Sequence, residues 1–92
     1  MKLTREQAVD LMRNQSDLGW KPVDRVYVED TRWSSIFEYV FLDEATGIHW
    51  QGTFVDPPEG LGWHDTIEKD VSFVRVTQRA KTIYVWDGLE TY

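Results

Sequence analysis

The segment RWSSIFEYVFLD, residues 32–43, constrains the fold most, because its second half is apolar on both faces. In a strand, successive side chains point to opposite sides of the sheet. The aromatic residues Phe37, Tyr39 and Phe41 share one side. The aliphatic residues Ile36, Val40 and Leu42 share the other. A strand that is apolar on both sides is typical of the centre of a sheet. We expect a helix to cover one of its faces and something else to cover the other.

The N-terminal segment carries the signals of a helix. Thr4 and Gln7 have the spacing of a capping box, and the apolar residues that follow recur at intervals of three and four. The next segment, NQSDLGWKP, disfavours a helix because it combines Asn, Ser, Gly and Pro. We therefore expect a helix over about residues 5–15, which must dock on the rest of the protein because so short a helix is marginal alone.

Alternating apolar and polar residues, bounded by turn residues, predict strands in the remainder of the chain. The expected strands cover about residues 25–30, 33–43, 47–56, 71–78 and 82–87. The turns DEATG and RAK would close two hairpins among them. The predicted fold class is α+β, in which one N-terminal helix packs on an antiparallel meander of about five strands. A chain of 92 residues is long enough for one such domain, residues 1–92, and too short for two.

Composition excludes several classes of protein. The chain has no Cys, so it has no disulfide, thiolate metal site or cysteine nucleophile. Its first residues are too charged for a signal peptide, and no apolar run approaches the length that spans a membrane. The net charge of −6 disfavours nonspecific binding to nucleic acid. We expect a cytoplasmic protein whose partners include neither a membrane nor nucleic acid.

The acidic residues are unevenly distributed. Seven acids and no Lys or Arg lie between Trp33 and Glu68. This distribution predicts one strongly acidic region on the folded protein. It also raises the hypothesis that the protein imitates DNA, although seven acids spread over this length are sparse for that purpose.

Neither a metal site nor a catalytic site has a clear signature. His49 and His64 could supply zinc ligands together with nearby carboxylates, but the two histidines are far apart in the chain and no short-spaced ligand pair is present. No Ser lies in a G-x-S-x-G nucleophile elbow. The EGLGW segment lacks the lysine of a phosphate-binding loop. We predict a protein that is not an enzyme and uses no metal or cofactor.

The stretch GIHWQGTFVDPPEGLGWHD, residues 47–65, combines aromatic, acidic and loop-forming residues. Trp63 lies in its Pro/Gly-rich part, and Trp is enriched among the residues that dominate binding at protein interfaces. One interpretation is that Trp63 anchors a partner protein. The other is that Trp63 and Leu61 fold back and close the open end of the core. On the first interpretation, the partner-binding residues are Trp63, Leu61, His64, Glu59, Asp65 and His49.

The segments TRW and VSFVRVTQRAKTIYVW, with the aromatic hairpin between them, resemble small uncharacterised early or accessory proteins of tailed bacteriophages. Phages of actinobacteria carry the nearest examples. The resemblance covers about residues 25–86, and the chain departs from the family pattern at FVDPPEGLGWHD. It implies a non-catalytic protein that binds one bacterial host or defence protein and inhibits or redirects it in the cytoplasm of the infected cell. The family offers no catalytic residues to transfer.

Two alternative functions remain open at this stage. The first is an acidic DNA mimic that inhibits a nucleic-acid-binding enzyme. The second is a homodimeric virion or assembly component that pairs through the strand expected at residues 82–87, which comes last and could form a sheet edge. Both a monomer and a homodimer are compatible with the sequence.

Overall fold

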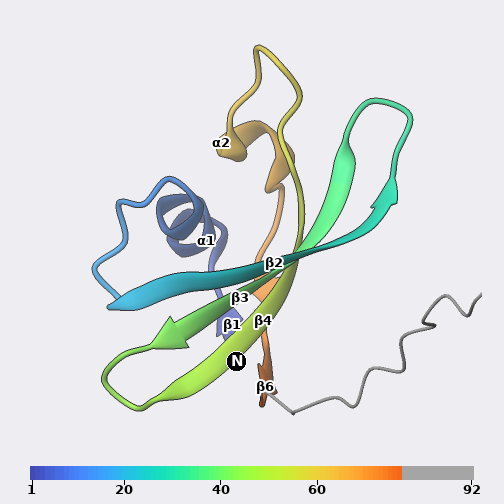
Figure 1. Cartoon of the computed structure of the whole chain (residues 1–92). Helices are drawn as coiled ribbons and strands as arrows, with labels where there is room; N and C mark the ends of the chain where they lie inside the picture. Colours follow the sequence, from blue (N-terminus) through green and yellow to red (C-terminus); the bar gives the residue numbers. More distant parts are fainter. Residues whose placement is uncertain (78–92) are drawn as a thin grey trace, which may run out of the picture.

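The computed structural model describes residues 1–77, which form an α+β fold with antiparallel strands (Figure 1). The longest strands make a meander, and α1 lies beside it. In chain order, the elements are β1 (Lys2–Leu3), α1 (Arg5–Met12), β2 (Trp20–Asp30), β3 (Ser35–Asp43), β4 (Ile48–Val55), α2 (Trp63–Thr66), β5 (Val71–Ser72) and β6 (Val74–Val76).

The main sheet has the strand order β2-β3-β4-β6. β3 lies between β2 and β4, which confirms the central position predicted from its two apolar faces. A tight turn joins β3 to β4, and Gly47 adopts a φ of 73° there, a conformation that suits glycine. A second, two-stranded sheet pairs β1 with β5 and so brings the start of the chain next to residues 71–72.

The core lies between α1 and one face of the main sheet. α1 contributes Ala8, Val9 and Leu11, which are all buried. The opposing aromatic side chains include Phe41 and Phe54, which are 2% and 3% exposed. Thr4 begins the helix with the predicted capping box, in which its hydroxyl accepts a hydrogen bond from the Gln7 backbone and its own N–H donates to the Gln7 side chain.

One close approach inside the core depends on a glycine. Gly52 lies on β4 opposite Tyr39, on the face that points into the core. The ring of Phe73 occupies the space above it, so a Cβ atom on Gly52 would lie only 2.6 Å from Cε1 of Phe73. Phe73 is 2% exposed, and its ring contacts Trp20 edge-on at a centroid distance of 5.3 Å. The core is therefore closed on this side by a ring packed directly on backbone.

The helix and the second strand differ in length from their predicted ranges. α1 ends at Met12 instead of near residue 15, because Asn14 adopts a left-handed φ of 58° that ends the helix and that Asn tolerates well. β2 begins at Trp20 instead of residue 25, because its pairing with β3 continues to Trp20 opposite Asp43. Pro22 is tolerated within β2 because this is an edge strand in the described sheet.

The segment predicted as one strand over residues 71–78 forms two short strands in different sheets. β5 pairs with β1 and β6 pairs with β4. Phe73 lies between them and is buried in the core, so the chain changes partner at this residue. The structure also contains β1 and α2, which the sequence pattern did not predict. The strand expected at residues 82–87 lies outside the described residues.

Candidate binding surface

The loop between β4 and β5 places Trp63 against the core. Trp63 begins the single turn of α2 and is half-buried. Its ring meets the rings of Tyr39 and Phe54 at centroid distances of 5.9 Å and 6.2 Å, each nearly perpendicular. Such edge-to-face contacts are favourable for aromatic pairs. Of the two interpretations of Trp63, the geometry matches the one in which this residue closes the end of the core.

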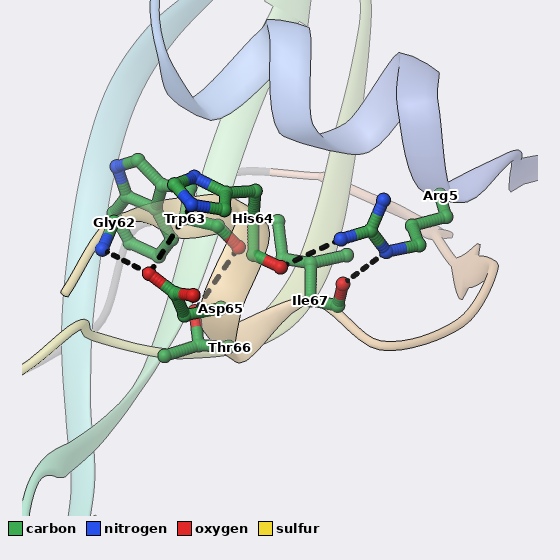
Figure 2. Close-up of polar contacts among 7 residues, drawn as sticks. All are labelled: Arg5, Gly62, Trp63, His64, Asp65, Thr66 and Ile67. Atoms are coloured by element: carbon green, nitrogen blue, oxygen red, sulfur yellow. Dashed lines mark hydrogen bonds and ion pairs between the residues drawn. The ribbon is translucent and has the colours of Figure 1, made fainter.

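Arg5 fixes the same loop to α1, as Figure 2 shows. Its Nε donates a hydrogen bond of 2.7 Å to the carbonyl oxygen of Ile67, and its Nη2 donates one of 2.6 Å to that of His64. The Arg5 backbone N–H also donates to Oδ1 of Asp70 at 3.1 Å. The last carbonyls of a helix need external donors, and one guanidinium supplies two of them here. Arg5 is thus a structural residue that the sequence pattern gave no reason to single out.

Four other predicted contact residues remain on the surface of this loop. Glu59, Leu61, His64 and Asp65 are all exposed, and Leu61 retains 52% of its accessible area. Nε2 of His64 lies 3.4 Å from Oδ2 of Asp65, which also accepts a hydrogen bond of 2.8 Å from the backbone of Gly62. The half-buried Trp63 therefore lies on a loop with three exposed polar residues and one exposed apolar residue, Leu61.

His49, the sixth predicted contact residue, does not belong to this group. It lies on β4 opposite Val76 of β6, and its side chain lines a groove on the sheet. Its neighbours on β4, Ile48 and Trp50, point to the other face because strand side chains alternate. The two histidines therefore occupy separate regions, and residues 1–77 contain no group of three His, Asp or Glu side chains that could hold a metal ion.

Among the tryptophans of residues 1–77, Trp33 is the most exposed; it lies at the tip of the β2–β3 hairpin, where 76% of its area is accessible. The sequence prediction placed Trp33 at the start of a strand, but β3 begins two residues later. Residues 31–34 instead form a turn between the two strands. The polar residues around Trp33 in TRWSS were the only signal of this turn. Trp33 is therefore the functional candidate that the sequence analysis missed.

Hydrogen bonds hold the turn in one conformation. The Thr31 hydroxyl accepts from the Ser34 backbone N–H at 2.9 Å, and the Thr31 backbone N–H donates to the Ser34 carbonyl at 2.6 Å. The Ser35 hydroxyl donates to Oδ1 of Asp30 at 2.7 Å across the base of the turn. The guanidinium of Arg32 lies 5.0 Å from the centre of the Trp33 ring. Trp33 is thus presented to solvent on an ordered support.

A row of aromatic rings continues from this tip toward the core. We call residues 25–37 the hairpin arm, which extends to the upper right in Figure 1. Tyr27, which is 55% exposed, contacts Phe37 edge-on at 5.8 Å, and Phe37 lies 6.3 Å from Tyr39. Arg25 places its guanidinium 4.4 Å from the centre of the Phe37 ring. The arm therefore shows an aromatic face of mixed exposure that is continuous with the buried rings.

Asp56 connects the base of the arm to the loop that follows β4. Its carboxylate accepts a hydrogen bond from the hydroxyl of Tyr39 and lies 3.6 Å from Nη1 of Arg25. Burial and the hydrogen bond to Asp56 raise the pKa of Tyr39 to about 12. These contacts involve β2, β3 and the start of the loop, so they set the position of the arm relative to the body.

The acidic stretch does not form one region. Asp43 and Glu44 lie at the turn between β3 and β4. Asp56, Glu59, Asp65 and Glu68 lie beyond the far end of β4, where the Asp56 backbone N–H bonds the Ser35 carbonyl. The lengths of β3 and β4 separate the two groups, and the seventh acid, Glu38, lies between them on β3. The expectation of a single acidic region is therefore wrong. The β3–β4 hairpin places one part of the acidic stretch at one end of the sheet and another part at the opposite end.

Comparisons with known proteins identify no relative of this chain. No protein-family model, no curated protein and no solved structure matches the chain. Within residues 1–77, no helix is long and apolar enough to cross a membrane.

Proposed function

We propose that this chain is a small non-catalytic binding protein of the phage type, which contacts one bacterial host or defence protein through the hairpin arm. Binding would inhibit or redirect that protein in the cytoplasm of the infected cell. The observation that carries the proposal is Trp33, an indole with 76% of its area exposed on a turn fixed by hydrogen bonds. The resemblance of the sequence to early or accessory phage proteins supports the biological setting.

Trp33 has the properties of an anchor residue. Tryptophan is among the residues most enriched at the energetic centres of interfaces, and its large ring can be buried at low entropic cost when its support is already ordered. Tyr27 and Val28 on the same arm are 55% and 45% exposed. The arm thus combines a projecting ring with adjacent apolar surface, which a partner could cover together.

The net charge of the chain suggests the character of the partner. Glu29 and Asp30 lie beside the turn that carries Trp33, and both are exposed. The chain as a whole has a net charge of −6. Complementary charge accelerates encounter and sets specificity more than it holds a complex together. Arg25 and Arg32 balance these two acids on the arm, so the charge argument rests on the whole chain. We propose a basic partner surface with an apolar pocket that receives the indole.

The test is to capture the partner from a bacterial lysate, identify it, and measure its affinity for single variants of the purified chain. Trp33→Ala should weaken binding by about 30-fold or more, which corresponds to about 2 kcal/mol. Its free energy of unfolding should remain within about 0.5 kcal/mol of the original, because the ring lies outside the core. Leu61→Ala is the matched control, since Leu61 is also exposed but lies on the α2 loop.

The same measurement separates the other hypotheses. Unchanged affinity in Trp33→Ala would refute the arm as the contact surface, and a loss in Leu61→Ala alone would relocate it to the α2 loop. Affinity that falls steeply with added salt, with little effect of Trp33→Ala, would favour the DNA mimic instead. Light scattering that shows only a dimer, with Trp33 shielded in it, would favour an assembly component.

A further inference from the structure

The face of the main sheet opposite α1 contains a groove of about 600 Å³. Val23 and Val26 of β2, Val40 of β3 and Val76 of β6 supply its apolar lining, and Asp24 is among the polar groups beside them. Val23 and Val26 are 46% and 47% exposed. The lining thus combines four valines with four polar residues, Asp24, His49, Gln51 and Thr77, and the groove crosses the strands from β2 to β6.

This face needs a cover that residues 1–77 do not provide. A sheet with apolar side chains on both sides is stable when both sides are packed. α1 packs on the side that carries Phe41 and Phe54. Ile36, Val40 and Leu42 alternate with those core-facing residues and so lie on the opposite side. No described helix or strand packs on that side. α1 contacts α2 and β1, and its partners in the core lie on the side of the sheet that carries Phe41 and Phe54.

The segment of residues 78–92 follows directly on a residue of this groove. Thr77, the last described residue, is itself part of the groove lining. Residues 78–92 follow and include the consecutive apolar residues 83–86, with the sequence IYVW. Four paired strands are about 14 Å across from first to last, whereas fifteen extended residues span up to about 50 Å. The remaining chain is long enough to cross the groove completely.

We propose that residues 78–92 dock in this groove of their own chain, with Ile83, Tyr84, Val85 and Trp86 covering the valines. Arg79 and Lys81 precede this apolar segment and complement the carboxylate of Asp24 in the groove. A segment tethered so closely has an effective concentration in the millimolar range, which disfavours a second copy at micromolar concentration. Pairing of residues 78–92 with the outer edge of β6 would form fewer hydrogen bonds, because β6 has only three residues.

The test uses the absence of Cys in the chain. The variant Val26→Cys places a thiol in the groove, and Leu61→Cys places a control thiol at a site of similar exposure among the described residues, 47% against 52%. Both are full-length chains with a conservative change at a half-exposed position. The reaction of each thiol with a maleimide is followed at several protein concentrations. Docking should slow the reaction in Val26→Cys by about tenfold relative to Leu61→Cys, as protected sites react only on local opening.

A second pair of variants assigns the protection. Adding Ile83→Asp and Val85→Asp to Val26→Cys should restore its rate to within about twofold of the control, since charged residues would not remain packed against the valines. The same two changes added to Leu61→Cys should have no effect on its rate. Equal rates in Val26→Cys and Leu61→Cys would overturn the proposal, because the groove would then be open. Protection that grows with protein concentration would assign the cover to a second copy instead, and protection that survives both aspartates would exclude residues 83 and 85 from it.

Discussion

Gly52→Ala introduces a single methyl group where the ring of Phe73 packs on the β4 backbone. The new Cβ would lie 2.6, 2.9 and 3.0 Å from Cε1, Cδ1 and Cζ of Phe73, whereas carbon atoms in favourable contact are about 3.5–4.0 Å apart. The ring must therefore move by about 1 Å. It has little room, because Phe54 and Phe41 hold it at centroid distances of 5.8 Å and 6.2 Å.

The expected loss of stability follows from two opposing terms. Overpacking of a filled core costs about 1–3 kcal/mol. Replacing glycine by alanine in an ordinary backbone conformation returns about 0.4–1 kcal/mol by restricting the unfolded chain. Gly52 is not among the residues with positive φ, so this second term applies. The net destabilisation should be about 1–2 kcal/mol, which corresponds to a fall in Tm of roughly 5–15 °C for a domain of this size.

A double-mutant cycle tests the cause as well as the size of the effect. Urea denaturation followed by tryptophan fluorescence would give the free energy of unfolding of Gly52→Ala, Phe73→Leu and the double variant. Because the smaller Leu leaves space for the new methyl group, the double variant should be at least 1 kcal/mol more stable than additivity predicts. Thr53→Ala is the control on the adjacent exposed residue and should change stability by less than about 0.5 kcal/mol. A neutral Gly52→Ala, or equal losses in both Phe73 backgrounds, would refute the packing argument.

Further predictions concern Trp63, Arg5, Tyr39 and metal dependence. Trp63→Ala should cost about 3 kcal/mol of stability, the lower end for large aromatic residues in cores, while partner affinity measured below the melting transition should be retained; a stable variant that had lost binding would restore Trp63 as an anchor. Arg5→Met keeps the apolar stem but removes both hydrogen bonds to the α2 loop, so it should lower the free energy of unfolding by about 2 kcal/mol in urea titrations, and an unchanged midpoint would show that the clamp is dispensable. The pKa of Tyr39 is raised to about 12 from 10.0, so the folded state holds this proton more tightly than the unfolded state. Stability from this group should be fully present below pH 10 and be lost as the pH rises toward 12; the difference between the original chain and Tyr39→Phe, measured by melting across that range, should show this slope, and parallel profiles would contradict it. Prolonged chelation should leave the Tm unchanged, and a fall of several degrees would reveal a structural metal.

Local patterns were sufficient for those parts of the fold that depend on neighbouring residues. The capping box at Thr4 involves residues three apart, and the central position of β3 follows from alternation within one segment. Trp63 was harder to place, because a Pro/Gly-rich loop does not indicate which way its side chain will point. Its burial depends on Tyr39 and Phe54 from two other strands and on the guanidinium of Arg5. Such contacts between distant segments leave no periodic signal in the sequence.

The exposure of Trp33 was hidden by a boundary error of two residues. The predicted strand included Trp33 and so implied that it pairs with a neighbouring strand. The hydrogen bonds between Thr31 and Ser34 instead place it in a turn outside the strand pairing. The division of residues 71–76 between two sheets had a similar cause. The valine-rich segment VSFVRV has the composition of one continuous strand, and only the attachment of β5 to β1 reveals the change of partner. Pattern alone cannot choose between two available sheet edges.

The pairing of β1 with β5 has a consequence for the order of folding. Lys2 lies opposite Ser72 and Leu3 opposite Val71, so this contact closes a loop of nearly the whole described chain. Closing a loop of that length costs on the order of 4 kcal/mol of chain entropy, and contacts between remote residues slow folding. The β2–β3–β4 meander has only short connections and can assemble first. During synthesis on a ribosome, α1 would emerge early yet could dock completely only after Phe73, which follows Met12 by 61 residues, had left the exit tunnel.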